Sequence, residues 1–181
     1  MKQPTVQGEM IVLRPIGPGD VDAVWDLVQD PQARRLAGMV EQVSRAQVEA
    51  RCTSPAEDES SLDLAVTANG SDEYLGEISL YGINRAVGRA GLRLLMRPAY
   101  RGRGYGTEAI QLLLGLAFDG LGLHRVGADV LSINTRALSM YENLGFRPEG
   151  RLREAARDGE RWCDVVVLGI LDDEYRVTEP V

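Results

Sequence analysis

Apolar and polar residues along this chain recur with two different periods. A period of two residues marks the strands. Short segments that alternate apolar with polar residues, or that are apolar throughout, predict strands. The turn NGSDE at 69–73 lies between two of them and is typical of a hairpin. A helix is not expected at 85–101, because this segment contains Gly88, Gly91 and Pro98; residues 90–96 are therefore predicted to be a strand. The predicted strands are 10–16, 62–68, 74–83, 90–96, 125–133 and 164–171.

Helical spacing marks the remaining apolar segments. Asp20 is a fair N-cap for a helix in which Val21, Val24, Trp25 and Val28 share a face. A weaker helix is predicted at 44–52, followed by a polar loop at 54–61.

The second half of the chain predicts two more helices. The first, at 107–122, is buried on the face of Ile110, Leu113, Leu114 and Ala117. The second runs between Asn134 as N-cap and Gly145 as terminator. The order of elements is mixed α/β.

The length and composition predict one globular domain, residues 1–181. The 181 residues are 44% hydrophobic and 26% charged, and no apolar run reaches the ~18 residues that span a bilayer. The first residues contain no apolar stretch of signal-peptide length, so we expect a cytoplasmic protein without membrane partners. Cys52 and Cys163 stand apart from any C-x-x-C or Cys/His pattern, which favours reduced structural thiols over a metal site.

The distribution of charge points to an anionic ligand. A net charge of −7 argues against a general nucleic-acid binder, because phosphate backbones require basic surfaces. Between Glu77 and Glu108 the sequence contains no acidic residue. This interval predicts a basic island around a glycine-rich loop. Its arginines are Arg85, Arg89, Arg93, Arg97, Arg101 and Arg103.

The glycine-rich loop is the stretch RGRGYG at 101–106, directly before the apolar helix. Alternating glycines let backbone N–H groups approach a ligand, and the positive end of a following helix favours an anion, most simply phosphate. Walker A is excluded because Gly106 is followed by Thr107 and Glu108, and the dinucleotide pattern fails at Thr107. The remaining pattern is R-x-x-G-x-G.

With the strand before this loop, the helix after it and the later N-x₆-Y-E-N-L-G-F motif, the chain resembles the GNAT superfamily of acetyl-CoA-dependent N-acetyltransferases. Within it, the chain is similar to the branch of ribosomal-protein N-terminal and polyamine acetyltransferases. The resemblance runs over nearly the whole chain. It implies the GNAT fold, a mixed, mainly antiparallel sheet flanked by helices, with acetyl-CoA between two splayed strands.

The resemblance also implies which residues meet the cofactor. The loop amides would cradle the pyrophosphate of coenzyme A, the strand end before the loop would bind the pantetheine arm, and an amide near Leu95 would stabilise the oxyanion. Asn134 and Tyr141 would contact the cofactor from the later helix. The expected cofactor-binding residues are Leu94, Leu95, Met96, Arg101, Gly102, Arg103, Gly104, Tyr105, Gly106, Thr107, Asn134 and Tyr141.

For the chemistry, the resemblance makes Tyr141 the acid that protonates the leaving thiolate; a core tyrosine is the structural alternative. The general base is open: Glu77 or water chains are the first choice, and Asp129 is a second carboxylate near the cofactor strand. The branch often carries an acidic residue where this chain has Gly91. No metal is expected.

The expected reaction is direct attack of a primary amine on acetyl-CoA in a ternary complex. The acceptor is a protein or peptide N-terminus or a small-molecule amine. A site without a strong base suits α-amines, of which roughly a tenth are neutral at pH 7, against about four in ten thousand for lysine side chains.

Three alternatives stay open: a non-catalytic acyl-CoA sensor, an antibiotic or amino-acid acetyltransferase, and a polyamine acetyltransferase. Several members of the branch are dimers, and the apolar strand at 164–171 would suit a shared sheet, so a homodimer is an expectation.

Overall fold

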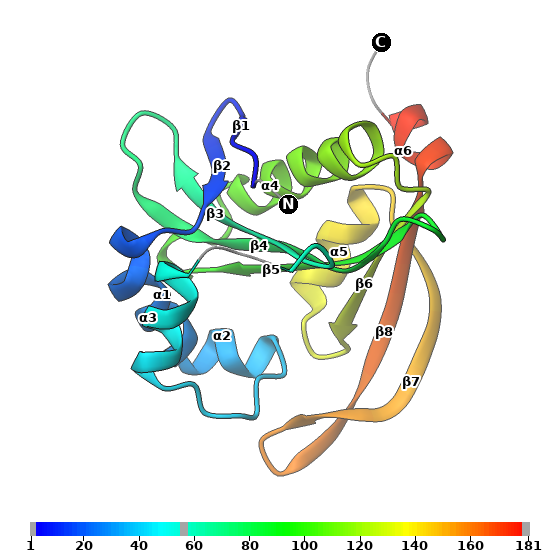
Figure 1. Ribbon diagram of the computed structural model, residues 1–181. Coiled ribbons are helices and arrows are strands. Elements are labelled where there is room, and N and C mark those ends of the chain that lie inside the picture. Colours follow the sequence, from blue (N-terminus) through cyan, green and yellow to red (C-terminus); the bar gives the residue numbers. More distant parts are fainter. Residues whose placement is uncertain (1–2, 55–57, 179–181) are drawn as a thin grey trace.

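The computed structural model describes residues 3–54 and 58–178 (Figure 1). The strands are β1 (Val6–Gln7), β2 (Ile11–Pro15), β3 (Leu62–Ala68), β4 (Tyr74–Asn84), β5 (Arg89–Met96), β6 (Arg125–Leu131), β7 (Arg147–Asp158) and β8 (Arg161–Leu171). The α-helices are α1 (Val21–Gln29), α2 (Pro31–Leu36), α3 (Arg45–Thr53), α4 (Tyr105–Gly115), α5 (Thr135–Asn143) and α6 (Asp172–Thr178). Shorter turns are η1 (Pro18–Asp20), η2 (Pro98–Tyr100) and the π-helical η3 (Leu116–Gly120).

The eight strands form one sheet in the order β1-β2-β3-β4-β5-β6-β8-β7. Within the described residues every neighbouring pair is antiparallel except β5 and β6. The mixed, mainly antiparallel sheet is confirmed. β8 lies between β6 and β7, so its apolar character is accounted for by its central position within one chain.

Helices cover both faces of the sheet (Figure 1). On one face α4 buries Ile110, Leu113 and Leu114, and η3 buries Ala117, in the same core as α5 and α6. On the other face α1, α2 and α3 pack in a second, smaller core that includes Leu95 of β5. The apolar face predicted for α4 is therefore confirmed.

The sheet opens between β5 and β6. Their parallel pairing covers only Arg89–Gly91 against Arg125–Gly127, although β5 continues to Met96 and β6 to Leu131. Beyond Gly91, the edge of β5 that faces β6 has no strand partner among the described residues. Unpaired strand backbone is a ready site for an extended, amide-bearing ligand. The splayed strands that the resemblance implied are therefore present.

Some elements were missed by the sequence pattern. β7 is exposed along almost its whole length, so it lacks the apolar alternation that reveals a half-buried strand. α2 and α6 are short, and β1 has two residues. Residues 55–57 of the predicted loop 54–61 lie outside the described residues.

Asp20 plays a different part from the predicted N-cap. It directly precedes α1 but its side chain caps no helix N–H there. Its carboxylate instead accepts hydrogen bonds from both terminal nitrogens of Arg14, at 2.7 and 2.8 Å. Burial opposes the charge of Asp20, yet the bonds from Arg14 and from the Gly17 N–H lower its pKa. The partly buried guanidinium of Arg14, six residues earlier at the end of β2, thus binds the carboxylate that was predicted to cap the helix.

Candidate functional site

The loop between β5 and α4 has the geometry of an anion site. Gly104 is the N-cap of α4 at φ +87°, and Gly102 has φ +76°. No side chain caps the first turn of α4, so its leading N–H groups face outward from the helix end. Uncapped amides at the positive end of a helix bind phosphate well. Positive φ is the conformation that glycine adopts without strain.

Gly106 is required for a different reason. It lies within α4 at ordinary helical angles, and a Cβ there would come 3.0 Å from Leu94 Cδ2. The missing side chain thus lets the first turn of α4 pack closely against β5. This contact places the amides of the loop beside the open edge of the strand.

A cleft of about 240 Å³ adjoins this loop. Residues of β5, the loop and α5 that the sequence predicted to bind the cofactor form its wall: Leu94, Leu95, Met96, Arg101, Gly102, Gly104, Gly106, Thr107 and Asn134. The wall also contains residues that were missed: Leu36, Ala37, Tyr100, Arg136, Ala137 and Met140. The predicted Arg103, Tyr105 and Tyr141 are not in the wall.

The basic island gathers at the loop only in part: Arg97, Arg101 and Arg103 lie there, and the other arginines of the island do not. Strand alternation sends Arg93 to the opposite face from Leu94, and Arg89 lies at the far end of β5. Arg103 is exposed and stands over the Tyr100 ring, with its Cζ 6.0 Å from the ring centroid. Arg101 is the member of the island in the cleft wall.

Arg101 and Arg136 shape the cleft from two sides. Arg101 donates from Nε to the Met96 carbonyl at 2.9 Å and from Nη1 to Gln32 Oε1 at 2.8 Å, tying the loop to β5 and α2. Arg136 lies across Gly102, where a Cβ would come 2.1 Å from its Nη2. Arg136, in the motif N-T-R, is 34 residues from Gly102 in the sequence, so no local pattern linked the two.

Asn134 caps α5 as predicted. Its Oδ1 accepts a hydrogen bond from the Ala137 N–H at 3.2 Å, and the residue also lines the cleft. One side of Asn134 therefore fixes the start of α5 where β6 ends. The cap and a contact with the cofactor are compatible.

Tyr141 is 4% exposed and packs edge-on against Phe146, with ring centroids 5.0 Å apart. Burial raises the pKa of Tyr141, and the nearby Tyr81 raises it further. Its hydroxyl is consequently protonated throughout the neutral range.

Glu77 lies on the face of the sheet covered by α1, α2 and α3, and it is paired in register with Leu95. It is 3% exposed. Its Oε2 accepts hydrogen bonds from Arg51 Nη2 at 2.8 Å and from the Tyr74 hydroxyl at 3.0 Å. Sequence reasoning missed both partners, because Arg51 comes from α3 in the segment whose pattern was weakest.

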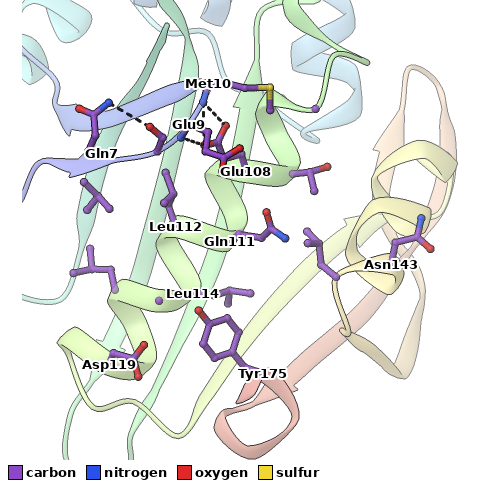
Figure 2. A pocket seen from close by; sticks show the side chains of 17 residues that line it. Gln7, Glu9, Met10, Glu108, Gln111, Leu112, Leu114, Asp119, Asn143 and Tyr175 are labelled. Atoms are coloured by element: carbon purple, nitrogen blue, oxygen red, sulfur yellow. Dashed lines mark hydrogen bonds between the residues drawn. The ribbon is translucent and has the colours of Figure 1, made fainter. Parts of the chain in front are cut away.

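A second, larger groove of about 1130 Å³ runs along the outer side of α4 (Figure 2). There Glu108 receives hydrogen bonds from the backbone N–H groups of Glu9 and Met10, so its carboxylate ties the β1–β2 turn to α4. Glu9, Glu108 and Asp119 make the lining acidic. The cleft with Arg101 and Arg136 is therefore the better place for the phosphates of the cofactor.

In residues 3–54 and 58–178 no helix has the length and apolarity needed to cross a membrane. Within the same ranges, His, Cys, Asp and Glu side chains do not gather in any group of three or more that suits a metal ion. His124, the single histidine of the sequence, is exposed next to the start of β6.

A splayed pair of strands, an uncapped helix start beside them and a buried tyrosine define the class: an α/β acyltransferase that holds an extended, phosphate-bearing acyl donor. The comparisons with known proteins place the chain more closely. Residues 10–147 match the family described as acetyltransferase (GNAT) domain, and the chain belongs to that family. It is an acetyl-CoA-dependent N-acetyltransferase.

The chain is similar to an uncharacterized N-acetyltransferase p20 of Bacillus licheniformis, at 26% identity over 94% of this chain and 98% of the relative. It is 30% identical to the spermidine N(1)-acetyltransferase of Escherichia coli (strain K12), over 65% of this chain and 62% of that protein. Its fold matches the crystal structure of spermidine N-acetyltransferase from Vibrio cholerae in complex with CoA and spermine. That match has a TM-score of 0.87 and 24% identity over 93% of this chain and 99% of the other.

Proposed function

We propose that the acceptor is a molecule with one primary α-amine, such as a peptide N-terminus or an amino acid, which attacks acetyl-CoA directly. The observation that carries this proposal is that two carboxylates of the acceptor face, the sheet face of Glu77 with the adjoining tip of the β7–β8 hairpin, are paired with arginines, whereas Asp129 on the same face has no ion-pair partner among the described residues and offers one charge to one amine. Glu77 is bound by Arg51, and Asp158 is bound by Arg35. Neutralised carboxylates offer little attraction to a polycation.

The donor side of the reaction uses the cleft wall. Backbone amides at the open edge of β5 near Leu95 polarise the thioester carbonyl, which favours the tetrahedral oxyanion. The amine nitrogen forms the new bond to the carbonyl carbon, and the carbon–sulfur bond then breaks. Tyr141 donates its proton to the departing sulfur, so the products are the acetylated amine and free coenzyme A.

The acceptor proton is harder to remove, and this favours α-amines. If Glu77 accepted a proton, its ion pair with Arg51 would be weakened. Because Glu77 is buried, the proton of the amine would have to reach it through bridging water molecules. An acceptor that arrives partly neutral avoids this step. At pH 7 roughly a tenth of α-amines are neutral, against about four in ten thousand lysine side chains.

A polyamine is the second candidate acceptor, and the spermidine acetyltransferases among the relatives favour it. Both candidates are tested in one assay of thiol release from acetyl-CoA. The matched panel is an unblocked dipeptide, an N-acetylated lysine dipeptide with its ε-amine free, and spermidine. Rates are measured from about pH 6 to about pH 9.5, a range that brackets the pKa of an α-amine.

We expect the unblocked dipeptide to be the best acceptor, with a rate that rises with pH and levels near the amine pKa, about 8. Glu77→Gln depresses the low-pH limb if Glu77 removes the proton and leaves it unchanged if water suffices. Efficient acetylation of spermidine or the ε-amine at pH 7, with the α-amine inert, would overturn the α-amine proposal.

We also propose a homodimer, on the resemblance to the branch alone. The apolar strand 164–171 no longer supports it, because β8 is enclosed by β6 and β7. Light scattering at tens of micromolar tests the assembly, and a monomer mass would reject it.

A further inference from the structure

A row of glycines crosses the acceptor face where β5 and β6 part. In register, Tyr81 of β4 is paired with Gly91 of β5, Gly91 with Gly127 of β6, and Gly127 with Gly169 of β8. Residues paired in register lie on the same side of a sheet. Three neighbouring strands therefore carry no side chain at one level, next to the opening of the cleft.

Two of these glycines are covered by neighbouring side chains. A Cβ at Gly91 would lie 2.4 Å from Tyr81 Cζ and 2.8 Å from its hydroxyl, so the tyrosine ring lies over Gly91. A Cβ at Gly169 would come 2.6 Å from both Arg125 Nη1 and Glu149 Oε1, which belong to an ion pair.

Gly127 lies between the two covered positions and has room for a methyl group without a clash. A Cβ built there would be in ordinary contact with the Leu168 carbonyl oxygen at 3.6 Å and with Arg125 Nη2 at 3.9 Å. The result is a small notch above Gly127, with the Tyr81 ring on one side and the Arg125–Glu149 pair on the other. Tyr81 is 41% exposed, so solvent reaches its ring.

Asp129 closes the notch toward the cofactor cleft. It lies two residues beyond Gly127 on β6, on the same face and past the last β5–β6 pair, and it is exposed. Among the described residues no Lys or Arg is within ion-pair distance of Asp129, in contrast to Glu77, Asp158 and Asp164. Its carboxylate is available to a cation.

The side chains around the notch are electrostatically linked. Burial raises the pKa of Tyr81, Asp129 raises it further, and Arg93 on β5 opposes the shift. Tyr81 also contributes to the raised pKa of Tyr141. Tyr81 is thus coupled electrostatically both to the carboxylate of Asp129 and to the tyrosine assigned as the acid.

We propose that this notch, bordered by Tyr81 and Asp129, seats the protonated amine of the acceptor before transfer. Asp129 supplies the opposite charge, and Tyr81 supplies a ring face and a hydroxyl in the space that a side chain at Gly91 would fill. Along the direction of the strands, Asp129 of β6 is displaced from Leu95 of β5 by two residues, about 7 Å. The inference rests on the proposed function, because it assumes an amine acceptor.

The test separates binding of the amine from binding of the cofactor. Asp129→Asn keeps the size and removes the charge, and Tyr81→Phe keeps the ring over Gly91 and removes the hydroxyl. Asp119→Asn, on η3 at the other face of the molecule, is the matched control. For each variant, KM and kcat for the unblocked dipeptide and the affinity for acetyl-CoA are measured. Tetramethylammonium, an unreactive cation, is used as a competitor and in direct titrations of the cofactor-loaded protein.

We expect Asp129→Asn to raise KM for the dipeptide and the inhibition constant of tetramethylammonium together, each by about 10-fold, the scale of one charge-assisted contact. Tyr81→Phe raises KM by about 3-fold, the scale of a neutral hydrogen bond. Acetyl-CoA affinity is unchanged, and the control resembles wild type. A purely structural role would lower stability or cofactor affinity without moving the two amine constants in parallel.

Unchanged KM and unchanged cation inhibition in Asp129→Asn would overturn the inference and leave the proposed function standing. If the wild type acetylates no amine, the proposed function fails. The direct titration then still decides the inference, because equal tetramethylammonium binding by wild type and Asp129→Asn, or binding by neither, rejects the notch.

Discussion

The two sides of the cleft between β5 and β6 are built differently. The cofactor side consists mainly of backbone: the loop 101–104, the start of α4 and the open edge of β5, with Asn134 at the start of α5. The acceptor side consists of side chains from separate elements, such as Arg51 of α3, Glu77 of β4 and Asp129 of β6. One side is specified by short sequence spacing and the other by the register of the sheet.

This difference teaches where specificity resides in the protein. Backbone amides and a helix end bind any phosphate-bearing donor of suitable shape, so the cofactor side fixes the class of reaction. The acceptor side sets which amine enters, because its carboxylates are either paired with an arginine, as Glu77 is, or available to a cation, as Asp129 is. Changes on the cofactor side should therefore abolish binding or turnover, and changes on the acceptor side should alter selectivity.

The largest expected effect is at Gly104. Gly104→Val places a β-branched residue at φ +87° at the start of α4, and it crowds the amides that face the cofactor. The affinity for acetyl-CoA should fall by about 100-fold or more, since strain at one such position costs up to about 3 kcal/mol. Calorimetry on the folded variant measures this. Gly150→Val is the control, because a Cβ there meets nothing within 4 Å. Unchanged affinity would remove the loop from the site.

The next largest effect is expected on kcat, with no change in the affinity for acetyl-CoA. Tyr141→Phe retains the edge-on contact with Phe146 and loses the acidic proton. We expect kcat to fall by about 100-fold, the low end for a positioned acid, with acetyl-CoA affinity and thermal stability as in wild type. Steady-state kinetics with the best acceptor checks this. Turnover near that of wild type would make Tyr141 a core residue only.

A smaller effect should distinguish two arginines beside the loop. Arg136 lies across Gly102 in the cleft wall, so Arg136→Ala should weaken acetyl-CoA binding by about 10-fold, the scale of one charge-assisted hydrogen bond. Arg103 is exposed, so Arg103→Ala should change affinity by about 3-fold or less. Titrations at low and high salt compare them. The reverse order would place the phosphates above Tyr100 instead.

The smallest effect is expected at the pair that joins α2 to the tip of the β7–β8 hairpin. Arg35 Nη2 donates to Asp158 Oδ2 at 2.8 Å, and this bond lowers the pKa of Asp158. A carboxyl whose pKa is lowered by folding stabilises the fold above its unfolded pKa, about 3.9, and loses that contribution as the pH falls through the folded value.

Arg35→Ala should therefore lower Tm slightly at neutral pH and have no effect once the pH is below the lowered pKa of Asp158, where that carboxyl is protonated in both proteins. Its KM for the amine should rise by about 3-fold at most, the scale of an exposed ion pair. Thermal unfolding of both proteins at the two pH values checks the sign. A Tm difference that persists in acid would show that Arg35 acts through packing and not through Asp158.

The sequence by itself determined the features whose causes are local. The hydrophobic pattern placed α4 and six strands, including β5 and β6 on the two sides of the cleft. Glycine spacing located the anion loop, and Asn134 and Gly145 bounded α5, because caps and turns depend on a few consecutive residues. The R-x-x-G-x-G and N-x₆-Y motifs then identified the family.

Only the tertiary structure decided what depends on contacts between distant segments. The pairing of β5 with β6 stops at Gly91, Arg136 crosses Gly102, and Arg51 engages Glu77, although no local pattern links these residues. The exposed strand β7 gave no apolar alternation to find. Register and long side chains assemble the acceptor side through space, and their energies depend on burial and partners that a linear pattern does not contain.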